Sequence, residues 1–160
     1  MIDPRAYVDK WARIDETVTI GAGAKIGNDT TLAPGACIDG SYIGNDCRIG
    51  HNVAMGPGFR IGNGCFIGPS CVLFNDAWPR AHQIGFDYEG LKSGDIICVI
   101  MEDGSSLCSH ACVMPGITIG RNAQVAAGAI VKKNVPADHL YTADDRIRPF
   151  TKEPARMRSV

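Results

Sequence analysis

A six-residue repeat governs most of this sequence. From Ile43 to Leu73 an aliphatic residue recurs at every sixth position, and glycine follows it five times in a row. Neither the 3.6-residue period of a helix nor the two-residue period of a strand produces this spacing. A short fixed repeat that contains turn residues is typical of a solenoid, so the hexads predict a parallel β-helix. Each hexad then supplies one short strand and one corner, and stacked coils bury a core that no single coil could bury.

The repeat covers both halves of the chain and is interrupted once. It starts at Ile2, loses one residue between Ile38 and Ile43, stops after Leu73 and resumes from Met101 to Val131. We expect the aliphatic residue of each hexad to point toward the axis of the coil. The Gly, Asn, Asp and Pro positions are expected at the corners, where the backbone turns.

The interruption predicts a loop at residues 74 to about 98 that projects from one corner. It contains Trp, Phe, Tyr, His and Arg side chains together with four acidic ones. A long insertion of this kind in a regular solenoid is usually functional. We therefore expect one all-β domain at residues 1–136, with this loop inserted in it. Residues 137–160 are expected to form a tail or a short helix that covers the open end of the coil.

Composition excludes several classes of function. The chain has 160 residues, of which 45% are hydrophobic, and a net charge of −1. This charge gives no case for a nucleic-acid partner, and no apolar run approaches the roughly 20 residues that span a membrane. We expect a cytoplasmic protein. The seven cysteines form no CxxC pair and are expected to be small buried thiols in a reducing compartment.

Two segments resemble a known family. Residues 68–80, which read Gly-Pro-Ser-Cys-Val-Leu-Phe-Asn-Asp-Ala-Trp-Pro-Arg, resemble hexapeptide-repeat acyltransferases that N-acetylate amino groups of nucleotide-linked amino sugars. Residues 116–136 resemble the acyl-CoA-binding coils of many hexapeptide acyltransferases. The chain departs from the family at Gly56-Pro57, where an aromatic and an acidic residue are usual. It also departs at residues 140–145, where a Gly-x-Pro-Ala motif is usual.

The resemblance implies a fold, an activity and an assembly. It implies a left-handed parallel β-helix with three hexads per coil, assembled as a homotrimer with acyl-CoA bound in a groove between subunits. The implied reaction moves an acetyl group from acetyl-CoA to the amino group of a nucleotide-linked sugar. It involves no metal.

Asn75 is the first candidate for a catalytic residue. By resemblance it is the active-site Asn of the family, and it stands where the last strand before the loop ends. Its carboxamide can hold the amine or donate a hydrogen bond to a developing oxyanion, but it cannot accept the proton. The alternative role is an Asn that caps a turn. Its neighbours Asp76, Pro79 and Arg80 are assigned to substrate binding by the same resemblance.

A general base would most naturally be a histidine. His82 lies in the loop and is the candidate, whereas His51 and His110 are expected to be ordinary corner residues, and His139 carries little weight. In the alternative mechanism the departing thiolate takes the amine proton, and the sequence leaves both routes open.

By resemblance, Ala127 and Gly128 contact the donor through their backbone, and Lys132 contacts its pantetheine or phosphates. Small side chains let a ligand approach the backbone closely. Lys132 and Lys133 also fit the simpler interpretation of solvated corner residues.

Three alternative functions can be weighed against the sequence. A γ-type carbonic anhydrase shares the fold but needs two of its three zinc-binding histidines close together in the sequence, and no close pair exists here. An acyltransferase with another small acceptor stays open. So does a non-catalytic scaffold subunit, although a scaffold has no need for the Asn, His and aromatic residues of the loop.

Overall fold

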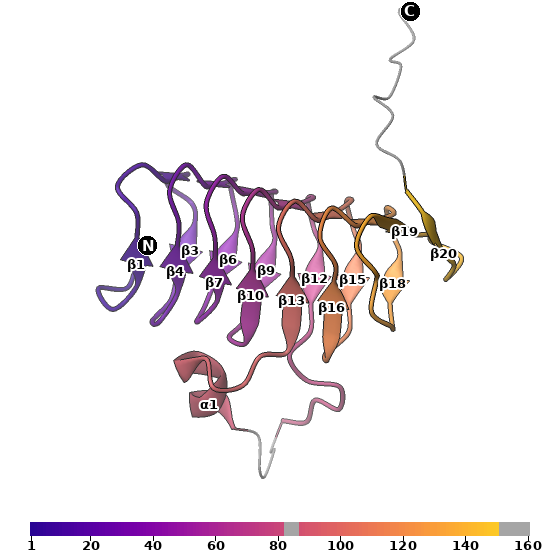
Figure 1. Ribbon diagram of the computed structural model, residues 1–160. Coiled ribbons are helices and arrows are strands. Elements are labelled where there is room, and N and C mark those ends of the chain that lie inside the picture. The colour runs from indigo at the N-terminus through magenta and orange to yellow at the C-terminus, as the bar shows by residue number, and fades with distance from the viewer. Residues whose placement is uncertain (82–86, 151–160) are drawn as a thin grey trace, which may run out of the picture.

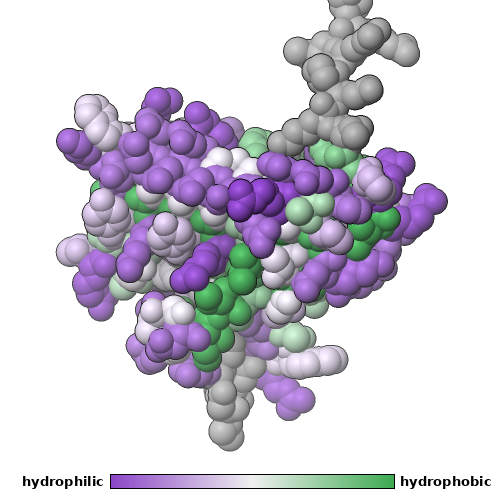
Figure 2. Space-filling model, in the orientation of Figure 1, coloured by the Kyte–Doolittle hydropathy of each residue, from purple (hydrophilic) through white to green (hydrophobic). Residues whose placement is uncertain are grey.

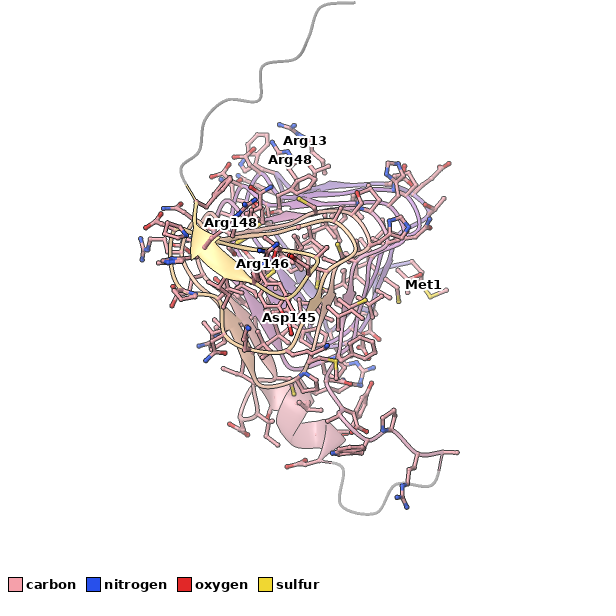
Figure 3. All side chains as sticks on the ribbon, turned by 90° about the vertical axis from the view of Figure 1, so that its right-hand side faces the viewer. Met1, Arg13, Arg48, Asp145, Arg146 and Arg148 are labelled. Atoms are coloured by element: carbon pink, nitrogen blue, oxygen red, sulfur yellow. The ribbon has the colours of Figure 1, made fainter. Side chains whose placement is uncertain are left out.

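The computed structural model describes residues 1–81 and 87–150. Strands β1 to β18 wind through three parallel sheets in turn, and Figure 1 shows the resulting row of coils. The fold is a left-handed parallel β-helix of hexapeptide repeats, as predicted. Viewed along its axis, the coil has a triangular outline with the loop at one corner (Figure 3).

The three sheets form the three faces of the coil. Sheet B contains β1 (Tyr7–Val8), β4 (Lys25–Ile26), β7 (Tyr42–Ile43), β10 (Phe59–Ile61), β13 (Val99–Met101) and β16 (Ile117–Ile119). Sheet C contains β2 (Arg13–Ile14), β5 (Thr31–Leu32), β8 (Arg48–Ile49), β11 (Phe66–Ile67), β14 (Ser106–Leu107), β17 (Gln124–Val125), β19 (His139–Tyr141) and β20 (Ile147–Pro149). Sheet A contains β3 (Thr19–Ile20), β6 (Cys37–Ile38), β9 (Ala54–Met55), β12 (Val72–Leu73), β15 (Cys112–Val113) and β18 (Ile130–Val131).

The predicted inward residues stack from coil to coil. In sheet B the register joins Ile26 to Ile43, Ile43 to Ile61, Ile61 to Met101 and Met101 to Ile119. All five are fully buried. Burial of one such side chain contributes about 1.5–3 kcal/mol, so the repeated column, rather than any single strand of two or three residues, stabilises the fold.

The cysteines divide into two groups. Cys47, Cys65 and Cys71 are buried at the small-residue position of their hexads, as predicted. Cys37 is exposed on sheet A, and Cys98, Cys108 and Cys112 are half-buried, so the prediction of buried thiols is wrong for these four. In the described residues all seven are free thiols.

We name the three corners of the coil by the sheets that they join. The B–C and C–A edges join strands within one coil, and the A–B edge joins one coil to the next. The loop leaves β12 and enters β13, so it occupies residues 74–98 and emerges from the A–B edge. Its described part contains the short helix α1 (Tyr88–Ser93).

The described part of the tail, residues 137–150, forms strands where a tail or short helix was expected. β19 adds to sheet C in parallel beside β17, and β20 then pairs with β19 in the antiparallel direction. Tyr141 of β19 is fully buried. The hairpin therefore covers the end of the coil with paired strands. No helix in the described residues is long and apolar enough to cross a membrane.

Candidate functional site at the A–B edge

Helix α1 folds back over the A–B edge of the preceding coils. Leu91 is buried and points at Gly58, where an added Cβ would lie 2.5 Å from its Cδ2 atom. Gly58 has φ of +95°, a conformation that favours glycine. Gly40, one coil earlier, has φ of +59°, and an added Cβ there would lie 3.4 Å from the Lys92 side chain. The Gly56-Pro57-Gly58 corner is therefore small because the loop packs on it, which gives a physical reason for the departure noted at Gly56-Pro57.

A hydrogen bond anchors α1 to the coil. The Tyr88 hydroxyl donates to Oδ2 of Asp39 at 2.7 Å, and this bond is the main cause that raises the pKa of Tyr88 to about 12. The Lys92 ammonium lies 4.6 Å from the centroid of the Tyr88 ring. No sequence pattern indicates this contact, because Asp39 lies 49 residues before Tyr88. Helix α1 covers the A–B edge on the N-terminal side of the loop.

Asn75 lies at the mouth of the loop, where the loop leaves the coil; it is half-buried, two residues after the end of β12. Its Nδ2 atom donates to the carbonyl oxygen of Pro57 at 3.2 Å. No described residue donates to its Oδ1 atom. Because the NH₂ group is held by the corner beneath, the carboxamide presents its oxygen as the free acceptor. The free oxygen can hold an amine, and the second hydrogen of the NH₂ group stays available as a donor.

Cys98, which was not among the candidates from the sequence, is the last residue of the loop and contacts the backbone of Asn75. Its thiol donates to the backbone oxygen of Asn75 at 3.4 Å. Burial, and then the nearby charge of Asp76, raise the pKa of this thiol. A raised pKa favours the neutral thiol over the nucleophilic thiolate. Cys98 fixes the backbone of the residue that carries the candidate carboxamide.

The remaining loop candidates surround this mouth. Asp76 is half-buried, and its Oδ1 atom accepts a hydrogen bond from the Trp78 amide at 2.8 Å. Pro79 and Arg80 are exposed further along the loop. His82 lies outside the described residues.

Lys132 belongs to the same edge as Asn75. It follows β18 directly, as Phe74 follows β12 and Met114 follows β15. The amide of Phe74 donates to Val113, and the amide of Met114 donates to Val131, so these three residues occupy successive coils. The exposed Lys132 therefore lies two coils away from the mouth, on its C-terminal side. Counting three hexads per coil would have found this alignment from the sequence.

Ala127 and Gly128 lie elsewhere, at the C–A edge between β17 and β18. His51 and His110 share that edge, and both are corner residues, as expected. Within one chain, sheet A separates Asn75 from the predicted donor-contacting turn.

The outward side chains of sheet A carry no charge. They are the first residues of its strands: Thr19, Cys37, Ala54, Val72, Cys112 and Ile130. The corresponding positions of the other sheets include Lys25 and Arg60 in sheet B and Arg13 and Arg48 in sheet C. Sheet A therefore presents an uncharged outward face.

Sheet B has a groove that does not include the mouth. It measures about 310 Å³ and is lined by Tyr42, Arg60, Ile100 and Arg121 among others. Figure 2 shows this face, which is mostly hydrophilic with a hydrophobic strip that runs toward the loop. No group of three or more His, Cys, Asp or Glu side chains that could hold a metal ion occurs in the described residues.

Comparisons with known proteins agree with this architecture. A family model described as bacterial transferase hexapeptide (six repeats) matches residues 40–75. A second, described as hexapeptide repeat of succinyl-transferase, matches residues 98–133. The bifunctional protein GlmU of Legionella pneumophila (strain Corby) is 27% identical over 88% of this chain, which spans 37% of the length of GlmU.

Solved structures with this fold include enzymes of nucleotide-sugar acylation. AntD from Bacillus cereus, an N-acyltransferase in complex with dTDP-4-amino-4,6-dideoxyglucose and coenzyme A, matches with a TM-score of 0.73 at 18% identity, over 90% of this chain and 83% of AntD. PerB from Caulobacter crescentus, in complex with CoA and GDP-perosamine, matches with a TM-score of 0.52 at 21% identity, over 89% of this chain and 56% of PerB. The chain is therefore a hexapeptide-repeat β-helix that resembles the acyltransferases built on this repeat.

Proposed function

We propose that this protein is a CoA-dependent N-acyltransferase that moves an acetyl group from acetyl-CoA to the amino group of a nucleotide-linked amino sugar. The observation that carries the proposal is the mouth of the loop, where Asn75 is held through its NH₂ group and offers a free oxygen. The ligands of AntD and PerB support the same class of reaction.

The chemistry follows from the donor and the acceptor. The Oδ1 atom of Asn75 accepts a hydrogen bond from the sugar amine and directs its lone pair at the thioester carbonyl carbon. A C–N bond forms and the C–S bond breaks, which releases CoA thiolate. The amine loses one proton, either to His82 or to the departing thiolate. A profile of rate against pH separates these routes, because a histidine base produces a rise in rate near its pKa of about 6.5 that His82→Asn would remove.

The site is completed by a second copy of the chain in a homotrimer. One chain places Asn75 and Lys132 at the A–B edge and Ala127 and Gly128 at the C–A edge. A threefold ring repeats one heterologous contact, so the C–A edge of one copy meets the A–B edge of the next. The uncharged face of sheet A, which joins the two edges, supports this arrangement.

The first experiment measures thermal unfolding with and without acetyl-CoA. A ligand at a hundred times its Kd stabilises the native state by about 2.7 kcal/mol. We expect a rise in Tm with acetyl-CoA, and release of free CoA thiol when a nucleotide-linked amino sugar is added. The matched control is the same nucleotide sugar with a hydroxyl group in place of the amine. No shift and no thiol release with any CoA ester would favour the scaffold alternative.

A further inference from the structure

At the end of sheet A, the Tyr141 side chain takes the place of the backbone partners that a further coil would provide. Among the described strands, β18 is the last of sheet A. In earlier coils the backbone amides and carbonyls form hydrogen bonds with the next coil. The Phe74 amide, for example, donates to the Val113 carbonyl, and the Met114 amide donates to the Val131 carbonyl. After β18, the Tyr141 hydroxyl takes that place. It accepts from the Lys132 amide at 3.4 Å and lies 3.1 Å from the carbonyl oxygen of Ile130, to which it can donate.

Tyr141 reaches this point from a different face of the coil. It belongs to β19 in sheet C, and its side chain is fully buried in the core. The hydroxyl is also hydrogen-bonded to the Asp145 carboxylate. Figure 3 shows Asp145 at the end of the coil, near Arg146 and Arg148 of the same hairpin. The hydroxyl has a single hydrogen, which the Ile130 carbonyl and the Asp145 carboxylate share, while its oxygen accepts from the Lys132 amide. A buried hydroxyl with these contacts leaves the chain around it little freedom.

The two lysines beside this hydroxyl differ in their partners. The Lys133 ammonium donates to the backbone oxygen of Asp145 at 3.0 Å and lies 3.9 Å from its carboxylate. It also lies 5.9 Å from the centroid of the Tyr141 ring. The Lys132 ammonium has no ion pair with any residue in 1–81 or 87–150. Lys132 thus combines a fixed backbone with an unpaired charge, at the same edge as Asn75.

We propose that Tyr141 is a positioning residue for the acyl donor: it fixes the backbone of Lys132 so that the ammonium of Lys132 meets the donor's phosphate groups. This inference rests on the proposed CoA-dependent function. It assigns a role to the segment at residues 140–145, which departs from the motif usual in the family. The Asp145 carboxylate lies within ion-pair distance of Lys133 and not of Lys132, although the charge of Lys132 also acts on it.

The test compares two donors in five proteins. The donors are acetyl-CoA and acetyl-pantetheine, which lacks the phosphates. The proteins are wild type, Lys132→Gln, Tyr141→Phe and the double variant, with Lys133→Gln as the matched control. We expect Tyr141→Phe to raise the KM for acetyl-CoA about three- to tenfold, which is the loss of one hydrogen bond, with kcat unchanged. With acetyl-pantetheine the KM should stay at its wild-type value.

The double variant shows whether Tyr141 acts through Lys132. If it does, Tyr141→Phe adds little to the rise in KM that Lys132→Gln already causes. Additive effects, or an equal rise with acetyl-pantetheine, would overturn the proposal. So would a lower Tm with an unchanged KM for acetyl-CoA, because that is the signature of a purely structural tyrosine.

The outcomes separate this inference from the proposed function. If wild type shows no turnover and no binding of acetyl-CoA, the proposed function fails. If wild type is active and Lys132→Gln weakens the donor while Tyr141→Phe does not, only the role of Tyr141 fails. Lys133→Gln should leave the KM unchanged, and a rise equal to that of Lys132→Gln would contradict the assignment of the free cation.

Discussion

The two edges of sheet A have different structures although the same repeat builds both. The C–A edge is a regular series of turns whose positive-φ residues vary, with Gly35, Asn52, Ser70, His110 and Gly128 in successive coils. At the A–B edge the positive-φ residues are all glycine: Gly23, Gly40, Gly58 and Gly116.

What packs on the turns accounts for part of the difference. At Gly58 the buried Leu91 of α1 leaves no room for a side chain, and at Gly40 Pro57 of the next coil leaves none. Turns at the C–A edge have no such cover in the described structure, and larger residues that tolerate positive φ occupy them. A uniform repeat thus provides a scaffold, and one insertion turns a single edge of it into a candidate site.

The largest effect is expected from a charge placed on the face between the two edges. Ala54→Arg introduces an unpaired charge into the uncharged face of sheet A, and burying such a charge in an interface is strongly unfavourable. We expect the trimer to dissociate and activity to be lost. Ser106→Arg, on sheet C, is the control and should leave both unchanged. Sedimentation velocity and thiol release measure the two properties, and an active Ala54→Arg trimer would contradict the predicted interface.

The next largest effect is expected at Asn75 of the A–B edge, with Asn52 of the C–A edge as the control. Asn75→Ala removes the acceptor at the mouth of the loop, and we expect kcat to fall about a hundredfold, as for a misplaced reacting group. Asn52→Gly removes an asparagine from the C–A edge and keeps a residue that tolerates its φ of +57°. This variant should keep the wild-type rate. Equal rates in wild type and Asn75→Ala would exclude Asn75 from the mechanism.

A smaller effect is expected where α1 packs on its edge. Leu91→Ala removes the buried anchor of the helix, and a buried Leu-to-Ala change costs about 2–5 kcal/mol. The coil does not depend on this contact, so we expect a nearly unchanged Tm, fast amide exchange at residues 88–93 and a raised KM for the acceptor. The exposed Glu89→Ala is the control. A cooperative loss of the whole fold would show that loop and coil form one unit.

The smallest effect concerns acid stability at the end of the coil. The hydrogen bond from Tyr141 is the main cause that lowers the pKa of Asp145, which is normally 3.8. A carboxyl with a lowered pKa stabilises the fold above its unfolded pKa, and this contribution is lost as the pH falls through the folded pKa. Tyr141→Phe should therefore reduce the fall of Tm below about pH 4. Identical slopes in the two proteins would show that Asp145 contributes nothing there.

The inward register of the coil could be read from the sequence, because a spacing of six residues fixes which side chain points to the axis. Ile26, Ile43 and Ile61 follow that rule, and so do the buried Cys47 and Cys65. The position of the loop followed from the same count, since the repeat stops after Leu73. These features depend on local period alone.

The contacts of the candidate residues were decided by the tertiary structure. Counting three hexads per coil places Asn75 and Lys132 at one edge and Ala127 at another, but it does not show what their side chains contact. The contact of Tyr88 with Asp39 depends on how the loop folds back. Tyr141 lies outside the six-residue register that ends at Val131, so no periodicity predicted its burial. Side chains that meet from distant coils or irregular segments are positioned by packing, which a short repeat does not encode.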